Sequence, residues 1–88
     1  MNEITMYQVE KFSTWVKVRE SLAKKVVEMV TSPQDIDIEE ETEILLRYNN
    51  SVDVLDDIEK EIGLRVEKSE NVKIASKIWL ARRKTIRY

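Results

Sequence analysis

Acidic side chains gather in the middle of the chain at a spacing that could serve a metal ion. Glu39, Glu40 and Glu43 lie close together on any helix, and Asp53 and Asp56 follow further along. Carboxylate oxygens are the ligands that Mg²⁺ prefers, so the lack of histidine is no objection to such a site. The same carboxylates also suit the first turns of a helix, where the helix dipole favours negative charge. The pattern is therefore compatible with metal chemistry and with a plain, solvated helix.

The pattern Glu39-Glu40-x-x-Glu43 followed by Asp53-x-x-Asp56 loosely resembles the paired acidic motifs of the all-α nucleoside triphosphate pyrophosphohydrolases. The resemblance covers residues 39–56 and implies a magnesium-dependent hydrolase that holds the ion near the phosphates. The sequence departs from the family pattern, because Asp53 stands where the family has glutamate and the interval between the motifs is short. In one continuous helix, Asp53 and Asp56 would also point away from Glu40 and Glu43. We keep this enzyme as a remote alternative and expect no catalytic residue, no metal ligand and no cofactor.

Basic side chains concentrate at the end of the chain. Residues 62–88 carry eight basic and two acidic side chains and residues 32–61 carry two and eleven, so the net charge of −2 hides two segments of opposite sign. Clustered cations on a helix face are typical of anion or nucleic-acid binding, although the two segments can equally pair with each other. The candidate residues for an anionic ligand, either a nucleotide at an oligomer interface or a nucleic acid, are Tyr7, Lys24, Lys25, Lys73, Lys77, Arg83, Lys84 and Arg87.

The composition excludes most other chemistry. Histidine and cysteine are both absent, which removes histidine-based nucleophilic triads, the usual zinc sites, iron–sulfur ligation and disulfides. One glycine and one proline leave little material for hairpin turns or phosphate-binding glycine loops, so the chain should be helical. With 42% hydrophobic and 36% charged residues in 88 positions, it suits one domain with one core.

The first expected helix spans residues 3–31. Its apolar side chains fall on an arc of about 200°, which is wider than one neighbouring helix can cover. Pro33 ends this helix, and either Ser32 or Asp37 can cap the next one. The helix should therefore lie between two partners, within a bundle or across a subunit interface.

A second, long helix is expected over residues 37–66. The apolar spacing runs unbroken through Asn49-Asn50-Ser51, although this cluster looks like a turn and would otherwise divide the segment into two shorter helices. Gly63 is a tolerated weak point or an early end of the helix. Ser69 can cap a third helix over residues 69–86.

Polar residues interrupt the apolar faces at matching heights of the expected hairpin. If the first two helices pack antiparallel, facing residues have numbers that add to about 68. Arg19 then faces Asn49 and Asn50, and Lys11 lies near Asp57 and Glu59. Matched polar layers set the register of a helix pair more than they add stability. The alternatives are that Arg19 extends along its aliphatic stem to solvent, or that it contacts a ligand or a partner subunit.

These features together predict an all-α fold, a long antiparallel helical hairpin plus a shorter C-terminal helix, in a single bundle-like domain over 1–88. The third helix is too short to cover the hairpin, so apolar surface should remain for a homo-oligomer or for another protein. No segment is apolar enough to span a bilayer and the start of the chain lacks a signal peptide, which favours a cytoplasmic location without membrane contact. We expect a small regulatory or inhibitory binding protein that occupies a partner's surface rather than an enzyme. The alternative is binding or sequestration of an anionic ligand, a nucleotide or a nucleic acid.

Overall fold

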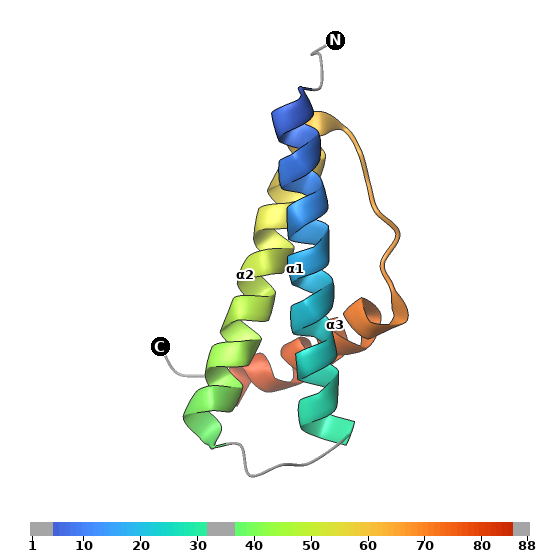
Figure 1. Cartoon of the computed structure of the whole chain (residues 1–88). Coiled ribbons are helices and arrows are strands. Elements are labelled where there is room, and N and C mark those ends of the chain that lie inside the picture. The colour runs from blue at the N-terminus through green and yellow to red at the C-terminus, as the bar shows by residue number, and fades with distance from the viewer. Residues whose placement is uncertain (1–4, 32–36, 86–88) are drawn as a thin grey trace.

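The computed structural model describes residues 5–31 and 37–85. In these ranges the protein is all-α, with helix α1 over Met6–Thr31, helix α2 over Ile38–Ile62, helix α3 over Glu70–Arg82 and a short 3-10 turn, η1, over Arg83–Thr85. Helix α1 packs against both α2 and α3. Figure 1 shows α1 and α2 side by side and antiparallel, with α3 crossing the half of the hairpin nearer to Thr31 and Ile38. The predicted all-α fold is therefore confirmed.

Local hydrogen bonds explain where the helices begin. Asp37 accepts a hydrogen bond from the Glu40 amide at 2.8 Å, and Ser69 accepts one from the Val72 amide at 3.2 Å, so both predicted caps are confirmed. The alternative cap, Ser32, lies outside the described residues. Helix α1 begins at Met6, because Thr5 is a non-helical cap, and residues 3 and 4 of the expected helix lie outside the described residues. The Thr5 hydroxyl accepts from the Gln8 amide at 3.2 Å while the Gln8 side chain accepts from the Thr5 amide at 2.9 Å, which is a capping box that the sequence reasoning overlooked.

Helix α2 passes without a break through Asn49, Asn50 and Ser51, which confirms one long helix over two short ones. It ends at Ile62, short of the expected residue 66, because Gly63 adopts the left-handed region with φ +73° and its amide bonds to the Glu59 carbonyl at 2.8 Å. The following residues are held away from helical geometry. The Val66 amide donates to the Glu59 side chain at 3.0 Å, and residues 64–69 run back along the hairpin toward α3 (Figure 1).

The register of the hairpin matches the expected one. The Gln8 side-chain amide donates to the Glu61 carboxylate at 3.3 Å, and these two residue numbers add to 69. The buried pairs that follow from the same register, Ala23 with Leu45 and Phe12 with Leu55, lie in common hydrophobic clusters. Facing positions on α1 and α2 can therefore be identified by residue number along the whole hairpin.

The core is divided into two clusters. The lower cluster joins α1, α2 and α3 through Ala23, Val26, Leu45, Tyr48, Val72 and Ala75. The upper cluster contains Phe12 from α1 with Leu55, Ile58 and Ile62 from α2, and none of its buried residues comes from α3. The third helix thus covers only one half of the hairpin, as its length predicts. Two buried polar residues of the described ranges, Arg19 and Ser51, occupy the helix positions between the two clusters.

Candidate functional site

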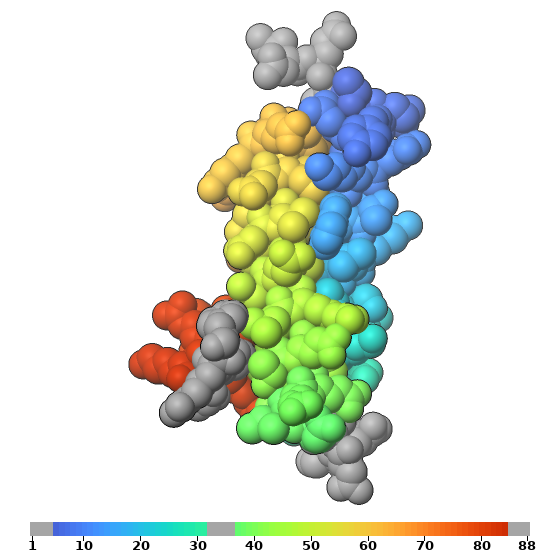
Figure 2. All heavy atoms as spheres, turned by 90° about the vertical axis from the view of Figure 1, so that its left-hand side faces the viewer, coloured from blue at the N-terminus to red at the C-terminus, as the bar shows by residue number. Residues whose placement is uncertain are grey.

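An open groove of about 880 Å³ runs between α1 and α2. Its floor is formed by Trp15, Val18 and Leu22 from α1 and by Leu46 and Asn50 from α2. None of the residues of α3 lines it. In Figure 2 the seam between α1 and α2 is visible along the molecule, while the end of α3 emerges on the other side of α2. We refer to this feature as the α1–α2 groove.

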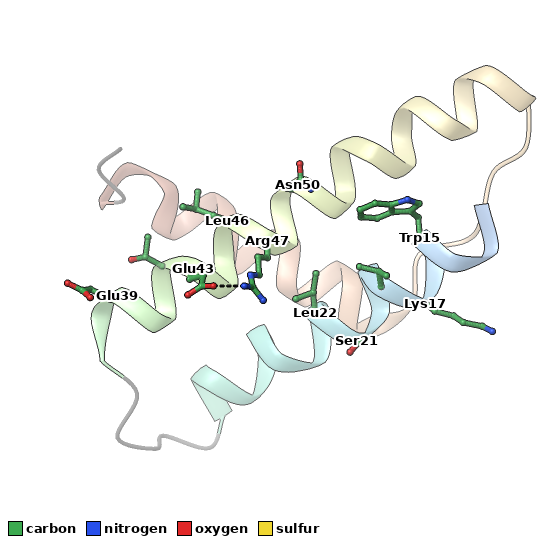
Figure 3. A pocket seen from close by; sticks show the side chains of 11 residues that line it. Trp15, Lys17, Ser21, Leu22, Glu39, Glu43, Leu46, Arg47 and Asn50 are labelled. Carbon is green, nitrogen blue, oxygen red and sulfur yellow. Dashed lines mark ion pairs between the residues drawn. The ribbon is translucent and has the colours of Figure 1, made fainter. Parts of the chain in front are cut away.

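The width of the apolar arc on α1 explains why the groove exists. One side of the arc packs on α2 and another on α3, and both sides contribute to the core. A third side carries Trp15, Val18 and Leu22, which are only half-buried. Figure 3 shows Trp15 and Leu22 extending from α1 toward α2, and Lys17, which also lines the groove, extending outward from α1. The expected surplus of apolar surface is therefore located on the outer face of the hairpin.

Charged side chains form the edge of the α1–α2 groove. Glu39, Glu43 and Arg47 line it on the α2 side, and Arg47 contacts Glu43 at 2.6 Å (Figure 3). Both partners of this ion pair are more than half exposed, so the pair contributes little to stability. Its main effect is to place opposite charges beside an apolar floor.

The carboxylates of the acidic pattern do not converge. Glu39 and Glu43 line the groove, whereas Glu40 is exposed in the first turn of α2 and Asp53 and Asp56 are exposed on later turns. Among the described residues there is no group of three or more acidic side chains placed to hold a metal ion. The continuous helix separates the two acidic motifs, as geometry requires of residues spread along one helix.

Arg19 is buried, with 2% of its surface exposed, so its side chain does not extend to solvent. Within the described ranges it forms no ion pair and no hydrogen bond, and its Nε atom is a buried donor without a partner. Asn49 is half-buried and Asn50 lines the groove, and neither donates to or accepts from Arg19 in the described structure. The pairing of Arg19 with Asn49 and Asn50 therefore stays a prediction.

Ser51 is the polar residue that sequence reasoning missed. It is fully buried and its hydroxyl donates to the Tyr48 carbonyl at 2.6 Å. The signal was present in the sequence, because the spacing Tyr48, Ser51, Leu55, Ile58 places the serine on the buried stripe of α2. Arg19 and Ser51 therefore make the buried polar level between the two core clusters.

The other members of the expected polar layer, Lys11 and Glu59, have different surroundings in the structure. Lys11 is exposed and lines a small hollow of about 260 Å³ with Tyr7 and Trp15. Glu59 is half-buried and accepts the hydrogen bond from the Val66 amide, which fixes the start of the loop after α2. No ion pair joins Lys11 to an acidic residue in the described part of the chain.

Tyr48 connects α2 to α3. Its hydroxyl donates to the Val72 carbonyl at 3.0 Å and lies 2.8 Å from the Ser76 hydroxyl. Burial raises the pKa of the Tyr48 hydroxyl above its ordinary value, and nearby Glu20 acts in the same direction; the Ser76 hydrogen bond and Arg19 oppose the shift. The neutral phenol is thus the form that the folded state prefers.

Replacing Tyr48 with phenylalanine is expected to lower the free energy of unfolding by about 1 kcal/mol at neutral pH, since the Val72 carbonyl loses its donor. The folded state of the native protein holds the Tyr48 proton more tightly than the unfolded state does. Stability should therefore fall as the pH rises past the ordinary tyrosine value of 10.0. Urea unfolding between pH 8 and pH 11 should show a steeper loss for the native chain than for Tyr48→Phe. Equal slopes would contradict the assigned role.

The basic candidates are spread over the surface. Lys24 and Lys25 on α1, Lys73 and Lys77 on α3, and Arg83 and Lys84 in η1 are exposed, and Tyr7 is exposed at the start of α1. None of these cations lines the α1–α2 groove, and Arg87 lies outside the described residues. Arg82 forms an ion pair with Glu41, which joins the basic segment to the acidic one.

No protein-family model, no curated protein and no solved structure matches this chain. None of the helices in the described part is both long and apolar enough to cross a bilayer.

Proposed function

We propose that the protein is a non-catalytic helical binding protein, regulatory or inhibitory in role, whose contact surface for protein partners is the α1–α2 groove. The observation that supports this most directly is the uncovered apolar floor of Trp15, Val18, Leu22 and Leu46 between two long helices. Exposed apolar surface with a polar rim is typical of protein interfaces. An amphipathic helix that places apolar side chains in such a groove is a common mode of recognition.

The anion-binding alternative has less support in the geometry. The candidate cations lie on α1, α3 and η1, and none of them lines the α1–α2 groove. A separate hollow of about 600 Å³ beside the loop after α2 is lined by Lys60, Arg65 and Lys68, which are not among the candidates, and its lining also includes the carboxylates of Asp56 and Glu59. Surface lysines on separate helices provide charge but no enclosed site for a nucleotide. The acidic balance of the chain would also repel a long polyanion.

A selection of displayed peptides on the immobilised protein tests the proposal. We expect enrichment of sequences with apolar residues at helical spacing, and chemical-shift changes at groove residues when a synthetic copy is added. Leu46→Lys should weaken this binding by about tenfold or more, because it places a charge on the apolar floor. Leu80→Lys is the matched control, since Leu80 is an exposed apolar residue on α3.

Two results would contradict the proposal. The first is binding of the selected peptides that is indifferent to Leu46→Lys. The second is an increase in the melting temperature with nucleotides or oligonucleotides that weakens at high salt, which would favour the anion-binding alternative.

A further inference from the structure

The charges beside the α1–α2 groove are arranged at equal intervals on the two helices. On α1, the stripe Lys11, Trp15, Val18, Leu22 and Lys25 has apolar residues in the centre and a lysine at each end. These positions follow three- and four-residue steps, so they share one side of the helix. The two lysines are exposed. Helix α1 therefore presents an apolar centre between two cations.

Helix α2 carries the matching stripe with the opposite sign. Glu43, Leu46, Asn50, Val54 and Asp57 follow the same helical steps, with an exposed carboxylate at each end. The lysines on α1 and the carboxylates on α2 are each 14 residues apart in the sequence, which corresponds to about 21 Å along a helix.

The two stripes also lie at the same heights of the hairpin. In the register shown by the Gln8–Glu61 hydrogen bond, Lys11 is level with Asp57 and Lys25 is level with Glu43. Yet no ion pair crosses the groove in the described structure, because the apolar floor separates its two sides. In the described structure no ion pair involves Lys11, Lys25 or Asp57. The ion pair of Glu43 is with Arg47 of its own helix.

We propose that a second copy of this chain covers the α1–α2 groove, with its two-fold axis parallel to the helices, so that α1 of each copy packs on α2 of the other. Under such an axis, each residue of the second copy lies at the same height along the hairpin as in the first copy, and α1 of the second copy lies opposite α2 of the first. Lys11 then faces Asp57 of the second copy, and Lys25 faces Glu43 of the second copy. Leu22 then faces Leu46 of the second copy, and at the centre of the stripes Val18 faces Asn50 of the second copy. This inference rests on the proposed function and names the occupant of its surface.

The charges also exclude the other face-to-face arrangement. A two-fold axis across the helices, at the level of Val18 and Asn50, would pack α1 on α1 and α2 on α2 in opposite directions. Because the charges are symmetric about Val18 and Asn50, Lys11 would then meet Lys25 of the second copy and Glu43 would meet Asp57 of the second copy. Like charges facing each other across an interface disfavour a complex strongly. With the axis parallel to the helices, each charged end of a stripe faces a charge of opposite sign. With the axis across the helices, each charged end faces a charge of the same sign.

The size of the face is adequate for a dimer. Helix α2 is about 38 Å long and two helices side by side are about 20 Å wide, a footprint of about 760 Å² that compares with about 800 Å² per partner in standard interfaces. The result would be a four-helix bundle of two stacked hairpins, with α3 of each copy on the outer side.

Charge reversal followed by mixing tests the dimer. The native chain should sediment as a dimer at micromolar to millimolar concentration, whereas Lys11→Glu/Lys25→Glu and Glu43→Lys/Asp57→Lys should each weaken dimerisation by at least about tenfold. Mixing the two double variants should restore a dimer, because each acidic face then meets a basic one. The substituted residues are exposed, and circular dichroism should show unchanged helix content.

Cross-linking distinguishes the two arrangements, and the absence of cysteine from the chain makes single-cysteine variants clean probes. A mixture of Val18→Cys and Asn50→Cys chains should cross-link through a short bismaleimide, whereas Val18→Cys alone should not cross-link to itself. Self-linking at Val18→Cys would overturn the proposed axis. A native chain that stays monomeric at every concentration, or a dimer that neither charge reversal weakens, would overturn the proposed dimer. If peptides still bind the groove of such a protein, the proposed function holds without the dimer.

Discussion

Replacing Arg19 with methionine is expected to raise the free energy of unfolding by about 1–4 kcal/mol. Arg19 is 2% exposed, and its Nε is a buried donor without a partner among the described residues. Folding buries this Nε donor without giving it a hydrogen bond among the described residues, and no ion pair to Arg19 is formed there. Methionine is unbranched and apolar, fills irregular gaps well, and would join the two hydrophobic clusters at the level where they are now divided.

Chemical denaturation of the native chain and of Arg19→Met at one fixed protein concentration measures the effect, because self-association would otherwise add to the apparent stability. Lys24→Met is the matched control. Lys24 lies on the same helix but is exposed, so its replacement should change stability by no more than about 0.5 kcal/mol. A lower stability of Arg19→Met would show that the guanidinium has a favourable partner in solution.

Replacing Leu55 with alanine is expected to lower the free energy of unfolding by about 2–5 kcal/mol. Leu55 is fully buried in the upper cluster, where only α1 and α2 contribute buried residues. Truncation there removes apolar contacts and leaves a cavity that the neighbouring Phe12 and Ile58 fill only in part. For a chain of this size, total stability is about 4–13 kcal/mol, so a single truncation removes a large fraction of it.

The measurement is again urea unfolding, with Leu80→Ala as the control. Leu80 is 54% exposed on α3 and contributes to neither cluster, so its truncation should cost less than about 1 kcal/mol. If Leu55→Ala and Leu80→Ala cost the same, the upper cluster would not be a close-packed part of the core.

The helical periodicity predicted the hairpin because it is carried by many residues. The apolar steps through Asn49 and Asn50 are stronger evidence of a continuous helix than the low helix propensity of asparagine is against it, and the structure confirms this. The antiparallel register also followed from sequence, because one short connection fixes which residues face each other. Helix ends were predicted less well. Gly63 ended α2 at the earlier of two possible positions, since only the three-dimensional course of residues 64–69 decides whether the helix continues.

The location of the candidate site was predictable only in part. The arc on α1 indicated surplus apolar surface, but the side that stays open depends on where α3 crosses, and no residue pattern encodes that crossing angle. The pairing of Arg19 with the asparagines was inferred from height alone. The level of a residue along the hairpin does not determine the direction in which its side chain leaves the helix. Ser51 therefore occupies the buried position at this level, while the neighbouring Asn50 lines the groove.

The divided core means that the two ends of the molecule need not open together. Three helices hold the lower cluster, whereas two helices and the loop residue Val66 hold the upper one. Amide protons of α2 near Ile58 and Ile62 should therefore exchange with solvent through a partial opening of the upper end, at a lower free energy than those near Leu45 and Tyr48. The buried level of Arg19 and Ser51 marks the boundary between two cooperative units within helices that are continuous in sequence.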